Sequence, residues 1–145
     1  MARVSRKNIA VTTVSADEEL KPYKACLYLR LSDEDERSIE DNSIGNQKKI
    51  CLEHLKKLPE IKVTASYIDN GASGTNFSRP GFKRMLQDLT NGRINCVVVK
   101  DLSRLGRNYL ETSEYLEKFF PEAGIRFIAV NNGYDSIRKL DGKQE

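Results

Sequence analysis

The sequence is poor in the side chains on which many catalytic mechanisms depend. Its 145 residues include one histidine and no tryptophan. The histidine, His54, stands among lysines in a helical pattern, which favours a solvated surface position over a catalytic one. Histidine-based general-base chemistry is therefore not expected.

Cysteine is also scarce, with three residues that lie far apart and form no CxxC pair: Cys26, Cys51 and Cys96. Each stands inside an apolar pattern, where a thiol is usually buried and free rather than a metal ligand. We therefore expect no metal site and a reducing environment, the bacterial cytoplasm.

Long apolar runs are absent, and stretches such as Cys96 to Val99 are far too short to span a bilayer. Residues 1–20 lack the apolar core of a signal peptide. The composition, 39% hydrophobic and 31% charged, is that of a globular domain, and the length suits one such domain. We expect a soluble protein without membrane contact: a flexible leader at residues 1–22 and a single domain at 23–138.

Charge is unevenly distributed along the chain, although the net value is only +3. Residues 33–41 carry six acids against one arginine, whereas the second half is rich in basic residues: Arg79, Lys83, Arg84, Arg93, Lys100, Arg104 and Arg107. A surface with separated signs would repel phosphate in one place and hold it in another.

Strand and helix patterns alternate along the chain. Strands are predicted at residues 24–31, 62–69, 94–99 and 125–130. Helices are predicted from a cap at Asn42 or Ser43 until Pro59, from Pro80 to Asn91-Gly92, and from about Tyr109 to Pro121, the last burying Leu110, Leu116, Phe119 and Phe120. This order implies right-handed crossovers and an α/β fold, a mainly parallel central sheet flanked by helices.

Three loops that follow predicted strands carry candidate site residues: Arg30 and Ser32, then Ser73 and Arg79, then Arg104 and Arg107. Ligands of open α/β sheets bind at such loops. An arginine fork matches phosphate oxygens, so several arginines around a serine hydroxyl describe a phosphoryl-transfer site. Each residue also has a plain structural explanation, as a cap, a solvated helix face or a flexible turn. The residues alone support an α/β domain with an anion site.

In order and spacing, these residues resemble the serine recombinases, the resolvase and invertase group with its large transposon and phage integrase branch. The resemblance spans about residues 24–135. It rests on Tyr28-Leu-Arg30-Leu-Ser32, Ser43-Ile-Gly-Asn-Gln47, Asp69-Asn-Gly71-Ala-Ser73-Gly74 with Arg79-Pro80-Gly81, and Leu102-Ser103-Arg104-Leu-Gly106-Arg107-Asn108. The segment KDLSRLGRN looks like the corresponding segment in the conjugative-transposon branch of the family.

The resemblance implies that Ser32 attacks the scissile phosphate and forms a 5′-phosphoserine linkage, without a cofactor because the bond energy is kept. It further implies that four arginines bind the phosphate, namely Arg30, Arg79, Arg104 and Arg107. Supporting positions are carried over to Tyr28, Gln47, Asp69, Ser73 and Lys100. The implied partners are DNA at paired recombination sites and further copies of the chain, as a homodimer or homotetramer. Residues 139–145 would begin a truncated long helix.

Two positions depart from the family pattern, which often has aspartate where this chain has Asn95 and Ser103. If those aspartates orient arginines, Asp101 is a possible substitute. Two other functions stay open: a recombinase-like interaction module whose chemistry has lapsed, and a small phosphate-ester hydrolase.

Overall fold

The computed structural model describes residues 22–31, 43–70, 79–106 and 108–140. Five strands form one sheet in the order β2-β1-β3-β4-β5. Their bounds are Tyr23–Leu31 (β1), Ile61–Asn70 (β2), Cys96–Val99 (β3), Arg126–Ala129 (β4) and Tyr134–Asp135 (β5). The first four strands run parallel and β5 runs antiparallel to β4. The predicted mainly parallel α/β fold is confirmed. Strand β5 was not predicted because two residues are too few to show the alternation of polar and apolar side chains that marks a strand.

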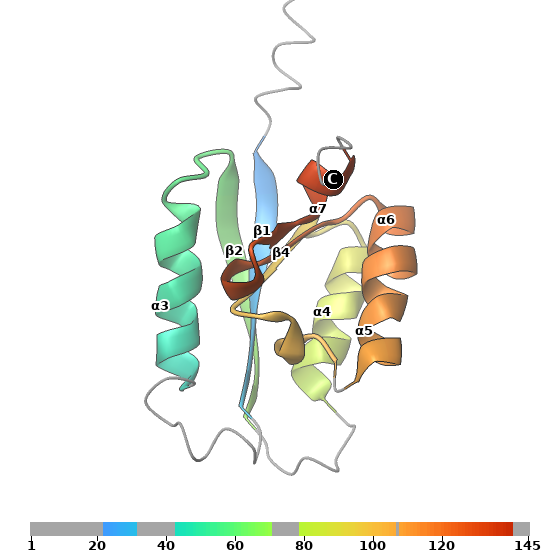
Figure 1. The fold of residues 1–145 in the computed structure, drawn as a ribbon, viewed down its shortest axis with the longest axis horizontal. Coiled ribbons are helices and arrows are strands. Elements are labelled where there is room, and N and C mark those ends of the chain that lie inside the picture. Colours follow the sequence, from blue (N-terminus) through green and yellow to red (C-terminus); the bar gives the residue numbers. More distant parts are fainter. Residues whose placement is uncertain (1–21, 32–42, 71–78, 107, 141–145) are drawn as a thin grey trace, which may run out of the picture.

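Helices cover both faces of this sheet (Figure 1). Helix α3 (Ile44–Leu55) lies on one face, where Cys51 and Leu55 pack against alternate residues of β1 and β3. Helix α4 (Pro80–Thr90) lies on the other face. Ser43 caps α3 by accepting from the Asn46 amide, but the helix ends at Leu55, one turn before the predicted end at Pro59.

The third predicted helix is built from three consecutive segments: α5 (Tyr109–Glu114), a π-helical stretch (Tyr115–Phe119) and α6 (Phe120–Ala123). It continues past Pro121, contrary to the prediction, because this residue falls in the first turn of α6, where proline is tolerated. The expected burial of Leu110 is also wrong, since this side chain is 78% exposed at the start of α5. The aromatic residues further along the helix supply the packing, with Phe120 stacked on Phe127 at 5.2 Å.

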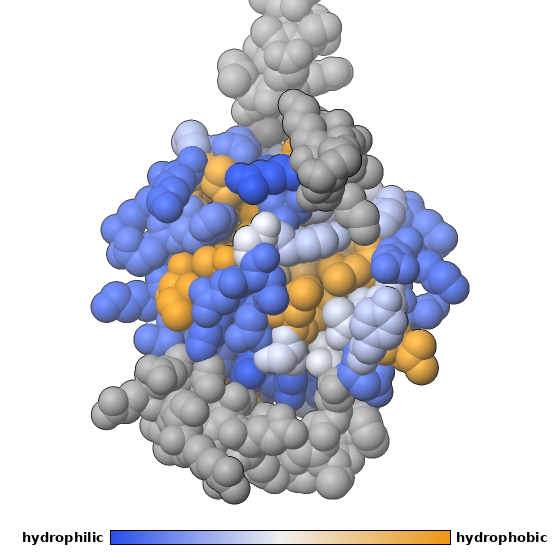
Figure 2. All heavy atoms as spheres, viewed as in Figure 1, coloured by the Kyte–Doolittle hydropathy of each residue, from blue (hydrophilic) through white to orange (hydrophobic). Residues whose placement is uncertain are grey.

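The cysteines are buried and free, as predicted. Burial raises the pKa of both Cys51 and Cys96 to about 12, so these thiols stay protonated at neutral pH. On the face shown in Figure 2, hydrophilic side chains lie between smaller apolar areas. Among helices in the described ranges, none has the length and apolar character that spanning a bilayer requires.

Candidate functional site

The carboxyl ends of the first three strands lie at one edge of the sheet, the lower edge in Figure 1. Arg30 of β1 stands opposite Asp69 of β2 in the parallel register. Lys100 follows the last residue of β3 directly and is buried. The parallel topology therefore brings three of the predicted site residues to one place.

Arg30 and Arg104 hold each other at this edge through their backbones. The Arg30 guanidinium donates from Nε to the carbonyl of Arg104 (3.2 Å) and from Nη2 to the carbonyl of Ser103. In return, Nη1 of Arg104 donates to the carbonyl of Arg30. Both side chains are buried. Two arginines 74 positions apart are thus fixed as one unit, which we call the arginine clamp.

Gln47 fixes the β1 side of the arginine clamp. Its amide oxygen accepts from the Arg30 backbone N–H (3.2 Å) and its amide nitrogen donates to the Arg30 carbonyl (2.9 Å). The side chain is completely buried on α3. The family resemblance implied a supporting position for Gln47. In the structure, the Gln47 side chain holds the backbone of Arg30.

Ser103 connects Asp101 to Arg104. Its hydroxyl donates to the Asp101 carboxylate (2.5 Å) and accepts from Nε (3.2 Å) and Nη2 (3.0 Å) of Arg104. The Asp101 carboxylate also lies 3.5 Å from Nε of Arg104. Ser103 and Asp101 thus place an acidic group against Arg104, which is the contact that an orienting role of Asp101 would require.

Asn95, the other departure, lies at the opposite end of the strand. It precedes β3, where its side-chain oxygen accepts from the Lys24 backbone N–H (2.9 Å) and its own N–H donates to the Lys24 carbonyl (2.9 Å). These bonds join β1 and β3 at their amino ends. Asn95 therefore does not orient the arginines, which lie at the carboxyl ends.

Asp69, Tyr28 and Arg79 form a second connected group. Asp69 accepts from the backbone N–H groups of Gly81 (2.8 Å) and Phe82 (3.0 Å), which begin α4, and from the Tyr28 hydroxyl (2.7 Å). The Tyr28 hydroxyl accepts from Nε of Arg79 (3.3 Å). Burial, and next the hydrogen bond to Asp69, raise the pKa of Tyr28 despite the opposing charge of Arg79. Tyr28 is therefore a neutral bridge between a carboxylate and a guanidinium.

The guanidinium of Arg79 is further held by groups from α4 and from the loop and helix after β3. It lies 3.9 Å from the ring centroid of Phe82, donates to the Leu105 carbonyl (2.7 Å) and pairs with Glu111 of α5 (3.3 Å). Sequence reasoning missed Glu111, because a glutamate in the first turn of a helix is common without any special role. The one sequence feature that could have pointed to Glu111 is its position four residues after Arg107, a predicted site residue.

Three predicted residues, Ser32, Ser73 and Arg107, lie outside the described residues. The others gather at one edge of the sheet and include three arginines and Lys100. In the described ranges, no three His, Cys, Asp or Glu side chains are placed to hold a metal ion. Cations fixed at the carboxyl ends of parallel strands are the arrangement expected of an anion-binding α/β domain.

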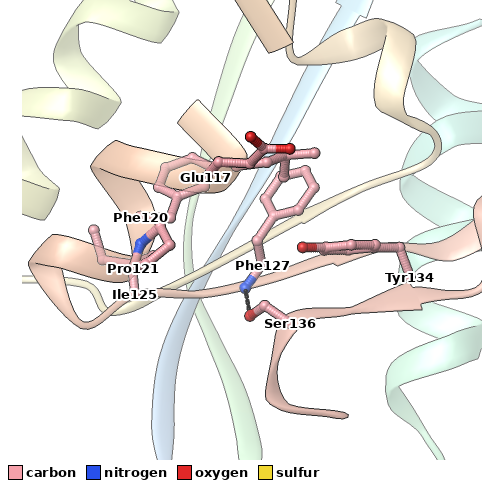
Figure 3. Close-up of a pocket in the computed structure, with 8 residues that line it drawn as sticks. Glu117, Phe120, Pro121, Ile125, Phe127, Tyr134 and Ser136 are labelled. Carbon is pink, nitrogen blue, oxygen red and sulfur yellow. Dashed lines mark hydrogen bonds between the residues drawn. The ribbon is translucent and has the colours of Figure 1, made fainter. Parts of the chain in front are cut away.

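A pocket of about 150 Å³ lies elsewhere, between α6 and the strands β4 and β5 (Figure 3). None of the arginines lines it. Its wall is mostly apolar and consists of Leu116, Glu117, Phe120, Pro121, Ile125, Phe127, Tyr134 and Ser136.

Comparison with known proteins gives the family. Residues 25–143 match the model of the resolvase N-terminal domain. The N-terminal catalytic domain of TP901-1 integrase is 26% identical, with a TM-score of 0.69 over 82% of this chain and 85% of that one. A resolvase family site-specific recombinase from Streptococcus pneumoniae is 30% identical, with a TM-score of 0.65 over 82% and 80%. A search of curated protein sequences gives no match.

The chain therefore belongs to the resolvase family, and its domain has the fold of the catalytic domains of serine recombinases. The resemblance read from the four sequence motifs is confirmed. Site-specific recombination of DNA is the activity of the family in general, and DNA the substrate that it implies.

Proposed function

We propose that the protein cleaves and rejoins DNA strands through a 5′-phosphoserine intermediate, as a recombinase of the conjugative-transposon type. The arginine clamp carries the proposal, because it fixes two guanidinium groups beside the end of β1, and Ser32 is the residue after that strand. Buried arginines fixed by backbone contacts form a preorganised site for a phosphate whose charge grows in the transition state.

In the proposed step, the Ser32 hydroxyl oxygen forms a bond to phosphorus and the bond to the 3′ oxygen breaks. The serine loses its proton and the departing 3′ oxygen gains one, so the products are a 5′-phosphoserine ester and a free 3′-hydroxyl. One phosphoester bond replaces another, and rejoining is the reverse step with an exchanged 3′ end. The atoms and electrons of this step therefore balance without an oxidant or a nucleotide.

Arg79 supplies a third guanidinium at the same edge, and Asp69 and Tyr28 set its position. Lys100, buried after β3, adds a further positive charge. We extend the proposal to Ser73, which follows β2 in the sequence, and to Arg107, which follows β3. Paired sites and self-association into a dimer or tetramer belong to the same proposal.

Replacement of Ser32 by alanine tests the mechanism. Purified protein is incubated with duplex DNA from the flanks of its own gene, quenched with denaturant, and assayed for protein covalently attached to 5′ ends. We expect a serine-linked adduct in the wild type and none in Ser32→Ala. Bound DNA without any adduct in the wild type would instead favour the lapsed interaction module.

Replacement of Ser103 by alanine tests the link from Asp101 to Arg104. Arg104 loses the acceptor of two hydrogen bonds, at 3.2 and 3.0 Å. We expect the rate of adduct formation to fall about tenfold, in line with the loss of a modest hydrogen bond to a charged group. Asn95→Asp is the matched control at the other departure and should stay within about twofold. Equal rates in the two variants would show that Ser103 does not support Arg104.

A further inference from the structure

Glu111 is the one carboxylate in the described residues that ion-pairs with Arg79, at 3.3 Å. The arginine side chain is 10% exposed and the glutamate 32% exposed, so the pair lies at the rim of the site. A guanidinium that is so far removed from water requires an anionic or strongly polar partner while no phosphate is bound. The carboxylate fills this requirement in the free protein.

Glu111 is held in this position by its surroundings. Its backbone N–H donates to the side chain of Asn108, which caps α5 (2.8 Å). A Cβ built on Gly106 would lie 3.1 Å from both Cγ and Oε1 of Glu111, and 3.0 Å from Thr112 Oγ1. A larger residue at 106 would therefore push the Glu111 and Thr112 side chains aside by a few tenths of an ångström. The motif glycine thus leaves space beside the Glu111 side chain, and the cap holds the Glu111 backbone at the start of α5.

We propose that Glu111 is a placeholder for the DNA phosphate: its carboxylate compensates Arg79 in the free protein and gives up that guanidinium when DNA binds. This inference rests on the proposed role of Arg79 in phosphate binding. Leu105 and Tyr28 hold two other edges of the guanidinium, so the Glu111 edge is the exchangeable one. A phosphate there meets a like charge on Glu111, which opposes binding until the carboxylate moves away.

Glu111→Gln tests this exchange, since glutamine keeps the shape and removes the charge. Binding of a short fluorescent DNA duplex is measured by anisotropy at several salt concentrations. We expect Glu111→Gln to bind about five- to tenfold more tightly at low salt. Because glutamine removes the negative charge that offsets Arg79 at the binding surface, the plot of log K against log salt should steepen by about 0.9.

Glu114→Gln is the matched control, one turn further along α5, where the glutamate is 65% exposed and pairs with Lys118 at 3.8 Å. It removes the same charge without touching Arg79 and should change affinity by less than about twofold. The gain in Glu111→Gln should also vanish when Arg79→Met is added. A purely structural role for Glu111 would lower stability without steepening the salt dependence.

The two proposals fail separately. If Glu111→Gln binds DNA no more tightly than Glu114→Gln, the placeholder is overturned, whatever the Ser32 adduct shows. If the gain and its dependence on Arg79 are found but no Ser32 adduct forms, the placeholder stands and the cleavage mechanism is overturned.

Discussion

Arg104→Lys should lower the rate of adduct formation by at least about a hundredfold, although it keeps the positive charge. Lysine has one nitrogen in place of the fork that reaches both Ser103 and the Arg30 carbonyl. The variant therefore removes the Arg104 side of the arginine clamp, while the bonds from Arg30 to the backbone carbonyls of Ser103 and Arg104 remain. Loss of a single preorganised donor in other enzymes costs about 10²–10³ in rate.

This loss should exceed any loss of stability, because Gln47 still holds the Arg30 backbone from α3 by two hydrogen bonds. Rates of adduct formation and urea unfolding curves are measured on the same preparations. Arg93→Lys is the control, since Arg93 is 73% exposed and lies before β3, at the other end of the sheet from the clamp. A hundredfold loss that is fully explained by unfolded protein would contradict a role for the clamp in catalysis.

The sequence predicted the fold well because strong local patterns and the parallel topology agree. Val97 to Val99 are apolar and branched, which suits a strand covered on both faces, and both faces are covered. Where prediction failed, a local pattern competed with tertiary packing. Leu110 fits a helical stripe, but the π-helical stretch that follows it sets the buried face with Tyr115, Phe119 and Phe120.

Topology predicts which residues gather at the edge of the sheet, but it does not predict the hydrogen bonds between them. Topology alone places Arg30, Asp69 and Lys100 at one edge, since carboxyl ends of parallel strands meet there. That Arg30 and Arg104 bind each other's backbone carbonyls depends on the path of the loop after β3, which no periodicity encodes. Glu111 was missed for the same reason, because its role depends on its distance from an arginine 32 positions earlier.

Arg126→Met should lower the free energy of unfolding by about 3 kcal/mol, a large loss for one domain. The buried guanidinium of Arg126 pairs with Asp135 (2.7 Å) and Glu60 (3.1 Å) and lies 4.9 Å from the ring centroid of Tyr23. The variant leaves the Asp135 carboxylate, 11% exposed, without its cation. Urea unfolding measures the loss, and Arg93→Met, which removes an exposed arginine paired at 3.7 Å, should cost less than about 1 kcal/mol.

A second replacement separates the abandoned charge from the lost contact. Adding Asp135→Asn to Arg126→Met should recover part of the stability, because the uncompensated carboxylate disappears while a side chain able to accept from the Ile137 N–H remains. The Ser136 hydroxyl also accepts from the Phe127 N–H (2.9 Å; Figure 3), which ties β4 to the start of α7 (Ser136–Leu140) next to the pair of Arg126 and Asp135. Amide exchange in α7 should therefore rise more in Arg126→Met than in the double variant. Equal exchange in the two would show that the abandoned charge is not what loosens this helix.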